Sequence, residues 1–562
     1  MTRFSLALLL ALSAAAQNTE PKTPELPPVK VLEVPERIGI ARSVTISLGE
    51  VIQRVLANDK DIEVSRIERQ EAVYNVRGAQ GYYDPLLGFY AHRAHSTTPV
   101  ASVLGGAPNG RLIQTEWFGD PQVSGLFPAL GGSYKLDFSS ARQVTNSQFA
   151  TLSPQYPTSV TLNLTQPLWR GLMFDQNRHR LQVAKKNAQL SDEQFRQEVI
   201  LIVTQAIAAY WELNFAYENL QVQIEAVRLA EQQDASNRRQ VQQGLLAPVD
   251  VVQTQTQIAT FQQTVFNAQQ NLTAAENALK VLMLPDRGDL MWSAALVPEQ
   301  RSDFRITVPV LDEAIQSAMS GRPELTESSL AIEVNHLDAK LTREQAKPQI
   351  DAVASLSTAG LAGHVLTSQN NSFATAFQPL IDQLNAIAAI AGIPPIPPIS
   401  LGGGTVPPIF AGSYGQSLST LAGGNFPSAT VGVQMTFPIR NRTAKAQVAI
   451  AEAEGHRLKV ARQQLEMTIE QDVRNAVQAA SSVQARVDAA TAARVYAEQQ
   501  YASEQRQFQA GTSTVFLVLQ RQTDLTVART REVRAKADLG EAAANLDRAM
   551  ARTIEAQGIQ LN

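Results

Sequence analysis

The chain of 562 residues contains no cysteine. This absence excludes disulfides, cysteine-ligated metal sites and the lipidated cysteine that follows a lipoprotein signal. Charged residues are also few, at 18% of the chain, against roughly 25% in typical soluble domains. The net charge of −4 lacks the basic excess of a nucleic-acid-binding protein, so we expect no nucleic-acid partner.

Histidine is scarce as well, with six residues scattered along the chain. His92 and His95 would point to opposite faces of a strand, which makes them a poor metal pair. The run Gly402-Gly403-Gly404 is not followed by the Lys-Ser/Thr of a phosphate-binding loop. We therefore predict that the protein is not an enzyme and that it has no catalytic residues, bound metal or cofactor.

About 18 uninterrupted apolar residues would indicate a membrane-spanning helix. The sequence has no such stretch outside the N-terminus. Residues 1–16 predict a secretory signal peptide, with Arg3, a short apolar stretch and Ala14-Ala15-Ala16 before Gln17. Residues 17–45 are rich in proline and predict an extended periplasmic tether. An exported chain without spanning helices can still cross a membrane as a closed barrel.

Two pairs of prolines mark the same pattern twice. Pro85 and Pro348 lie 263 residues apart, and Pro167 and Pro438 lie 271 apart. Near each proline the spacing of apolar residues changes between helical periodicity and strict alternation. We interpret this pattern as an internal duplication in which helices lead into short strands that proline ends. The four predicted strands are about 84–95, 158–168, 349–358 and 429–438.

The strands that end at Pro167 and Pro438 have one apolar face and one face of hydroxyls and amides. A membrane barrel places such an apolar face on lipid and the polar face on a wet lumen. The edge of a soluble sandwich is the alternative, because antiparallel sheets can also bury one face on a core. The residues predicted to face lipid are Val160, Leu162, Leu164, Val431, Val433 and Met435.

Most of the remaining chain has heptad spacing typical of long packed helices. Continuous helices are predicted over about 48–81, 174–243, 311–347 and 444–510, and return helices follow turns at 244–248 and 511–514. Apolar residues recur every seven positions on these helices and form a seam, the line along which two helices pack; each row of residues spaced by seven is called a lane. On the first long helix one lane is Val203, Tyr210, Tyr217 and Ile224, and on the helix that follows the turn one lane is Ile258, Val265, Leu272 and Leu279.

Two long insertions separate the strands, at 96–157 and 359–428. They join strands at the end opposite to the helices, so we expect them outside the cell. A short helix is predicted near 373–392, and an extra alternating run lies at 131–142. Both long helices of a repeat must leave the membrane on one side. We therefore expect two crossings per repeat and interpret the extra run as extramembrane.

Two segments carry a resemblance to a known family: Gln-Pro-Leu-Trp-Arg-Gly at 166–171 and Gly-Leu-Leu-Ala-Pro-Val-Asp-Val at 244–251. With the repeated helix–strand–strand–helix–turn–helix order, they resemble the TolC family of outer membrane efflux proteins. The likeness covers about residues 46–552. Its repeats are 46–295 and 305–552, followed by a tail at 553–562.

The resemblance implies a mainly α-helical fold with a membrane β-barrel. Three protomers would contribute four strands each to one twelve-stranded barrel, on a long periplasmic tunnel of coiled-coil helices. Trimerisation also follows from the strands themselves, because four strands cannot close a barrel and would leave sheet edges unpaired.

The resemblance further implies a channel in the outer membrane that exports passively. Its cargo would be drugs, metals, other small molecules or secreted proteins. Its partners would be a periplasmic adaptor and an inner-membrane pump, in a tripartite efflux or type I secretion complex. A periplasmic coiled-coil structural or adaptor protein of the cell envelope is the alternative, because it would also explain the heptads and the signal peptide.

The resemblance also implies two functional sites, both near the two helical turns of this chain. The residues matching the tips that dock the adaptor are Gly244, Leu245, Pro248, Gly511, Thr512 and Val515. The residues matching the periplasmic gate are Asp250, Leu517, Gln520 and Asp524. Leu517 and Gln520 stand where the family often has acidic residues, so we expect an apolar, amide-lined constriction with weak cation selectivity.

Overall fold

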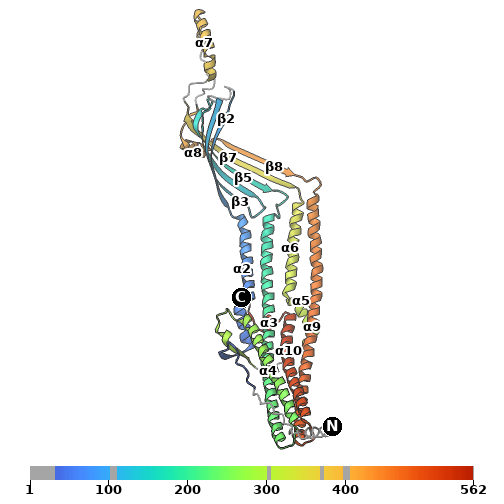
Figure 1. Ribbon diagram of the computed structural model, residues 1–562. Coiled ribbons are helices and arrows are strands. Elements are labelled where there is room, and N and C mark those ends of the chain that lie inside the picture. The colour runs from blue at the N-terminus through green and yellow to red at the C-terminus, as the bar shows by residue number, and fades with distance from the viewer. Residues whose placement is uncertain (1–31, 102–109, 300–304, 367–371, 397–405, 561–562) are drawn as a thin grey trace, which may run out of the picture. The chain divides into compact units, whose positions relative to one another are not determined.

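The computed structural model describes residues 32–101, 110–299, 305–366, 372–396 and 406–560, as two compact units (Figure 1). The hairpin unit comprises Met1–Arg69, Ser191–Glu327 and Ala461–Asn562, and the sheet unit comprises Gln70–Leu190 and Ser328–Val460. The predicted signal peptide at 1–16 and the first part of the predicted tether lie outside the described residues.

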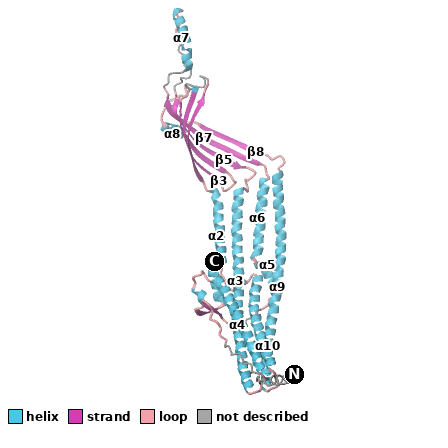
Figure 2. Ribbon diagram, in the orientation of Figure 1, coloured by secondary structure: helices cyan, strands magenta, loops and turns pink. Residues whose placement is uncertain are grey.

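Helices dominate the chain, and strands gather in one larger and one smaller sheet (Figure 2). The α-helices are α1 (Leu48–Asn58), α2 (Lys60–Gln80), α3 (Gln176–Gln242), α4 (Pro248–Met283), α5 (Leu311–Gly321), α6 (Pro323–Gln345), α7 (Ser372–Ile390), α8 (Tyr414–Ala422), α9 (Arg442–Gln509), α10 (Val515–Ala549) and α11 (Thr553–Ala556). The strands are β1 (Arg42–Ile46), β2 (Leu86–Pro99), β3 (Arg111–Leu126), β4 (Ser133–Thr145), β5 (Leu152–Pro167), β6 (Ala294–Pro298), β7 (Gln349–Val365) and β8 (Pro427–Thr436).

The helices predicted over 48–81 and 311–347 are each interrupted once, at Asp59 and at Arg322. Both residues have extended backbone angles. Asp59 then caps α2, because its Oδ1 accepts the N–H groups of Asp61 and Ile62 at 3.0 and 3.1 Å. Arg322 precedes Pro323, and a residue before proline disfavours helical angles. The prediction of two unbroken helices was therefore wrong.

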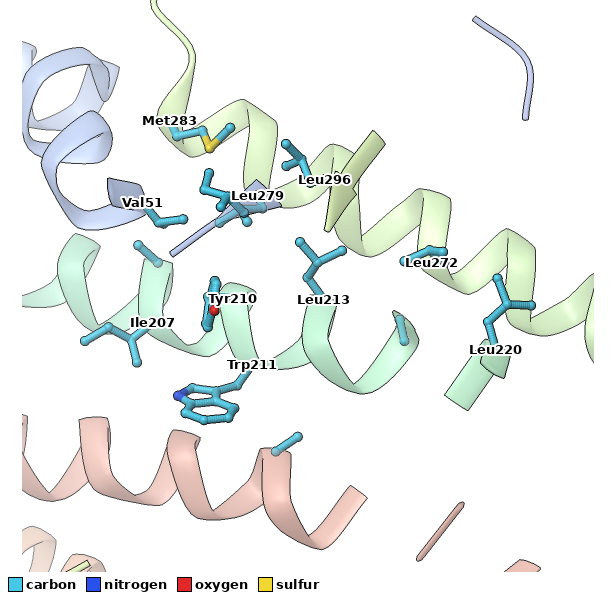
Figure 3. Packing of buried hydrophobic residues seen from close by; sticks show 14 of the residues in the cluster. Val51, Ile207, Tyr210, Trp211, Leu213, Leu220, Leu272, Leu279, Met283 and Leu296 are labelled. Atoms are coloured by element: carbon cyan, nitrogen blue, oxygen red, sulfur yellow. The ribbon is translucent and has the colours of Figure 1, made fainter. Parts of the chain in front are cut away.

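The heptad seam of the hairpin unit is its hydrophobic core. Tyr210 and Leu213 on α3 are buried against Leu272 and Leu279 on α4 (Figure 3). Val203 belongs to the same cluster. Such burial stabilises a helix far more than its intrinsic propensity does. The predicted lanes are confirmed for α3 and α4. On α10 the predicted leucines Leu525, Leu539 and Leu546 are also buried.

One helix, α3, is long and apolar enough to pass a length-and-composition test for a membrane span. Within the described residues it is the sole helix that does so, and 67% of its apolar window is buried inside the structure. Buried residues of α3 pack against α4 in the hydrophobic core, so core packing explains the apolar character of this helix.

A small parallel sheet joins β1 to β6, with Arg42 opposite Ala294 and Ile46 opposite Pro298. The sequence predicted only an extended tether there, so the end of that tether is in fact an ordered strand. The sheet is held to α4 by the two members of a buried ion pair on that helix: Lys280 Nζ donates to the carbonyl of Ala294 at 2.6 Å, and Glu276 Oε2 accepts the N–H of Leu296 at 3.1 Å. Short edge segments such as β1 carry too little pattern to be distinguished from a linker.

The larger sheet lies entirely in the sheet unit and has six antiparallel strands in the order β2-β3-β4-β5-β7-β8. The prediction of four strands per chain was therefore wrong. The run at 131–142, interpreted as extramembrane, forms most of β4 between β3 and β5. β3 was not predicted at all. The sequence signal was weak there because Pro121 interrupts the strand pattern.

The two faces of this sheet differ in polarity. On β5, Val160, Leu162 and Leu164 share one face, and Leu162 lies opposite Leu136 on β4 and Leu356 on β7. The other face carries hydroxyls, amides and several charges. Its residues on β3, β4 and β5 include Glu116, Asp120, Lys135, Asp137, Ser159, Thr161 and Asn163.

Helix α8 covers the far part of the apolar face, over β5 and β7. Ser417 Oγ lies 2.9 Å from Thr158 Oγ1, and a Cβ at Gly360 would overlap the backbone of Ser417. Gly360 therefore permits the close approach of α8. The helix predicted near 373–392 is present as α7.

Candidate functional site

The first candidate site is the turn between α3 and α4, in the hairpin unit. Gly244 has a φ of +72°, a left-handed angle that glycine adopts without steric cost. The N–H of Leu245 donates to the carbonyl of Gln240 at 2.8 Å and closes the end of α3. Pro248 opens α4, where its missing N–H has no partner to lose. The turn leaves the side chain of Leu245 70% exposed.

Asp250, which the resemblance placed in a gate, has a local role at this turn. Its Oδ2 accepts the N–H of Ala247 at 3.2 Å. A carboxylate in the first turn also complements the positive end of the helix dipole. Helix capping therefore accounts for Asp250 at this position, and its part in a gate stays a prediction.

The second candidate site is the turn between α9 and α10, also in the hairpin unit. Gly511 has a φ of +77°, and the N–H of Thr512 donates to the carbonyl of Gln507 at 2.9 Å. The hydroxyl of Ser513 donates to the carboxylate of Glu504. Thr514 caps α10 by accepting the N–H of Leu517 at 3.4 Å. This turn is therefore held by its own side chains.

The two turns share one hydrophobic cluster. Leu246 of the first turn packs against the cluster formed by the second hairpin, whose buried members are Tyr501, Phe508, Val515, Val518, Leu519 and Leu525. Burial raises the pKa of the Tyr501 phenol. Val515 is only 2% exposed. Its expected contact with a partner protein is therefore wrong, because its side chain holds the hairpin together.

Exposed apolar side chains surround both turns. Besides Leu245 they include Val249, in the first turn of α4, and Phe516, which is 62% exposed at the start of α10. Sequence reasoning missed both. The helical spacing could have predicted the exposure of Phe516, because this residue lies about 100° around the helix from Val515, which is on the packed face. An apolar residue so placed faces away from the hairpin core.

The other three predicted gate residues lie together on α10. Leu517 and Gln520 are exposed, and Gln520 Nε2 donates to Asp524 Oδ1 at 3.1 Å. Arg521 Nη1 lies 3.1 Å from Asp524 Oδ2. Sequence reasoning missed Arg521, although Arg-x-x-Asp is the spacing of an ion pair on one helix face. The charge of Asp524 is therefore largely balanced by its neighbour.

The four predicted boundary prolines lie at strand ends. Pro85 and Pro348 immediately precede β2 and β7, Pro167 is the last residue of β5, and Pro438 follows the end of β8 at Thr436. Proline cannot donate to a β-ladder, which suits it to these positions.

The residues predicted to face lipid share a single face of the sheet. Val431 lies opposite Ala354, which in turn lies opposite Leu164 on β5. On the edge strand β8, Val431, Val433 and Met435 are all exposed. The side of β5 that bears Thr158 is covered by α8, so the uncovered apolar surface begins at Val160.

Among the residues that the structure describes, no group of three or more His, Asp or Glu side chains is arranged to hold a metal ion. The charged side chains of α10 instead form ion pairs with each other and with neighbouring helices. Arg534, for example, contacts Glu212, Asp538 and Glu541.

The fold and the paired turns define a class of protein, the outer membrane channels built from long helical hairpins and a β-sheet. The sequence profile of the family described as outer membrane efflux protein matches residues 121–283 and 314–552. The chain therefore belongs to that family. It lies in the outer membrane, with its helical domain in the periplasm, and it is an efflux channel of a family of non-enzymatic transport proteins.

Solved structures share the fold at low sequence identity. The CmeC outer membrane channel of Campylobacter jejuni is similar with a TM-score of 0.61 and 14% identity, over 90% of this chain and 86% of that one. The outer membrane protein VceC of Vibrio cholerae is similar with a TM-score of 0.58 and 15% identity, over 90% and 96% of the two chains. No curated protein sequence matches the chain.

Proposed function

We propose that three copies of this chain form the exit duct of a tripartite efflux or type I secretion complex. The duct passively exports small solutes or secreted proteins that an inner-membrane pump delivers through a periplasmic adaptor. The observation that carries the proposal is the six-stranded sheet, which is apolar on one face, polar on the other and open at both edges. A wet pore through lipid needs these two faces and a closed ring of strands, so the two open edges must pair with those of other copies.

Lipid contact is assigned to the apolar face. Val160, Leu162 and Leu164 on β5 would face the bilayer with Val431, Val433 and Met435 on β8. The opposite face, with its hydroxyls, amides and charges, would line the lumen. The three residues on β8 are exposed and the three on β5 are half-buried, and a soluble protein would rarely leave such an apolar strip uncovered on one sheet.

Association of copies is supported within the helices too. On α2, Val64, Ile67 and Val73 are exposed, and on α9 Ile450 and Met467 are exposed. In a single chain these side chains are between 46% and 65% exposed. A neighbouring copy would bury them, and burial of apolar surface stabilises assembly by about 25 cal/mol per Å² before the costs of association.

An internal duplication accounts for the two halves of the tunnel wall. The helix breaks at Asp59 and Arg322 are separated by the same 263 residues as Pro85 and Pro348. The small sheet of β1 and β6 is found in the first half alone among the described residues. Three duplicated chains would thus supply six similar helical segments around one tunnel.

Adaptor docking is assigned to the two turns. Leu245 and Phe516 are the most exposed apolar side chains there, on turns held rigid by their caps and the shared cluster. Gly244, Pro248, Gly511 and Thr512 would shape the turns, and Val249 would extend the contact. Rigid apolar anchors of this kind dominate the free energy of many protein interfaces.

The double substitution Leu245→Asp with Phe516→Asp is expected to abolish adaptor binding. Each anchor is worth about 2 kcal/mol or more at an interface hot spot, so binding should weaken by about a thousandfold. The measurement is the amount of periplasmic adaptor that co-purifies with the channel from host membranes, quantified by mass spectrometry. Leu290→Asp, at another exposed leucine of the hairpin unit, is the matched control. Unchanged adaptor recovery with the double variant would refute docking at the turns.

The constriction is assigned to Leu517 and Gln520, with Asp524 paired to Arg521 beside them. Arg521→Ala is expected to raise the ratio of cation to anion permeability by about two- to threefold, because it leaves the Asp524 carboxylate unbalanced. Reversal potentials in asymmetric KCl across planar bilayers measure this ratio.

Arg228→Ala is the control for the constriction. Arg228 forms an equivalent ion pair on α3 with Glu225, and its hydrogen bond lowers the pKa of that carboxyl. The control should leave the ratio unchanged. If Arg521→Ala also has no effect, the constriction does not lie at this part of α10.

A further inference from the structure

We propose that the outer edge of β2 in one copy pairs with the outer edge of β8 in the next copy. Each copy then contributes six strands, and the barrel of three copies has eighteen strands instead of the twelve that the family resemblance implies. This inference rests on the proposed trimeric channel. It adds which strands join the copies and how wide the resulting barrel is.

The additional strands are integral to the sheet. β3 pairs with β2 from Leu86↔Ser124 to Pro99↔Arg111, and β4 pairs with β5 from Ser133↔Thr165 outward. β4 is therefore occupied on both sides, by β3 and by β5. In the part of the chain that the structure describes, β2 pairs with β3 alone and β8 with β7 alone. The free edges of the sheet are thus β2 and β8.

The family profile begins at residue 121, inside β3. β2 and the first part of β3 lie outside the matched region, although they hold a complete ladder with each other. The family profile therefore does not bear on the first strand of this sheet, and the strand pairing in the structure reveals the wider sheet.

The two free edges carry apolar residues on the same face of the sheet near their helix-proximal ends. The apolar face of β2 carries Leu87 and Phe89, and that of β8 carries Val431, Val433 and Met435, all of them exposed. The intervening residues are polar or small on β8, where they are Thr430, Gly432, Gln434 and Thr436. The two strands run in opposite directions, as antiparallel pairing requires, because β2 starts and β8 ends next to a helix.

The register across the sheet supplies the tilt that a barrel needs. The line of directly opposed residues that starts at Leu86 passes through Ser124, Lys135, Asn163 and Ser355 to Thr430. Thr430 lies six residues before Thr436, the last residue of β8. We propose that Leu86 of the next copy pairs with Thr436. Following opposed residues across the six strands of one copy, from Leu86 to Thr430, then ends six residues away along β8 from the point where the next copy begins.

A displacement equal to the strand number is the relation found in eight-stranded barrels with a shear of 8, where the strands tilt by about 36°. Closed barrels need tilts of roughly 35–45°. The same register places Leu87 opposite Met435 and Phe89 opposite Val433, so it joins apolar to apolar residues. A slip by one residue would remove both pairs, because it would place Leu87 opposite Gln434 or Thr436 and Phe89 opposite Gly432 or Gln434.

The width of the pore follows from the strand number. Barrel diameter grows roughly in proportion to the number of strands, so eighteen strands make a barrel about one and a half times as wide as twelve. The charged residues of the inner face, on β3 and β4, would then line the widened sector.

Disulfide trapping tests the pairing, and the chain's lack of cysteine provides a clean background. In the proposed register His92 of one copy lies opposite Thr430 of the next. Directly opposed antiparallel residues have Cα atoms about 4.5–5.5 Å apart, within the range of a disulfide. The variant His92→Cys with Thr430→Cys, oxidised in outer membranes, is expected to form covalent dimers and trimers on non-reducing gels.

Two further pairs complete the experiment. The four strands predicted from the sequence would place β2 next to β5, which the β2–β3 and β4–β5 ladders already exclude. Ser139→Cys with Thr430→Cys tests the remaining twelve-stranded arrangement, made of β4, β5, β7 and β8, in which β4 would be the free edge facing β8. Thr161→Cys with Ser357→Cys is the positive control, because these residues are direct partners within one chain and should form a disulfide that links no copies. We expect β2–β8 trapping and no β4–β8 trapping, because cysteines whose Cα atoms lie more than about 7 Å apart cannot be bridged.

Three other outcomes are possible, and each refutes either the strand pairing or the proposed channel. Trapping between β4 and β8 refutes the eighteen strands and leaves the proposed trimer intact. A trimer by native mass that forms the internal control disulfide but no β2–β8 disulfide also refutes the pairing. A chain that is extracted from outer membranes as a monomer, with no links between copies, refutes the proposed channel itself.

Discussion

The substitution Glu276→Ala is expected to lower the free energy of unfolding by about 3–5 kcal/mol, the cost of leaving a buried charge without its partner. Both Glu276 and Lys280 have fully buried side chains. Lys280 Nζ donates to Glu276 Oε1 at 2.6 Å and to the carbonyls of Trp292 and Ala294 at 3.0 and 2.6 Å. Without Glu276, the ammonium would keep two neutral acceptors and no negative charge.

The loss would spread beyond the pair, because Glu276 also organises the N-terminal segment. Its Oε2 accepts the N–H of Leu296 on β6 at 3.1 Å and binds Arg37 at 2.8 Å. In the variant the N–H of Leu296 would lose this acceptor, and Arg37 would keep only its hydrogen bond to the hydroxyl of Thr273. Denaturant titration of the detergent-extracted protein, followed by far-ultraviolet circular dichroism, measures the effect.

Two comparisons make the result specific. Glu454→Ala removes an exposed carboxylate that pairs with Arg457 on α9, and it should leave the unfolding midpoint unchanged. Replacing both Glu276 and Lys280 with methionine removes both charges and should recover part of the loss. If Glu276→Ala behaves like the Glu454 control, the pair does not stabilise the fold.

The substitution Gly540→Ala is expected to destabilise the protein by about 1–3 kcal/mol through overpacking. Gly540 lies inside α10, where alanine would ordinarily gain about 1 kcal/mol of helix propensity. A methyl group at this position would overlap the indole of Trp211 on α3. The indole is buried between helices (Figure 3), so either the ring or the helix must move.

A glycine with free space around it provides the matched control. Gly49, in the first turn of α1, has no atom within 4 Å of the position that a Cβ would take, so Gly49→Ala should be neutral or slightly stabilising. Adding Trp211→Leu to Gly540→Ala should restore stability, because the smaller side chain vacates the overlap. The measurement is thermal unfolding of the unchanged protein, Gly540→Ala, Gly49→Ala and the double variant. A higher melting temperature for Gly540→Ala would contradict the predicted overlap with Trp211.

Periodic features were the ones that sequence reasoning predicted well. Heptads over tens of residues on α3, α4 and α10 identified the helices, their buried lanes and the turns between them. Local chemistry also placed the prolines at the strand ends and the glycines at the turns. The class of protein followed from the order of these elements.

Features that depend on a single residue or on distant neighbours were missed. The break at Arg322 requires only a proline after it, yet it is hidden inside an otherwise helical pattern. Val515 was expected at a docking surface because it follows the turn, but contacts with Tyr501 and Phe508 bury it. The pairing of Asp524 with Arg521 needed the helix geometry around it.

Periodicity and turn residues thus identify the elements of this protein, because they act within a few positions along the chain. The pairing of β3 and β4 into a six-stranded sheet was decided only in three dimensions. Pro121 weakens the strand pattern of β3, and the ladders on both sides of it supply the backbone partners that a single strand cannot show. The same holds for Gly540 and Trp211, which are brought together by helix packing across more than three hundred residues of chain.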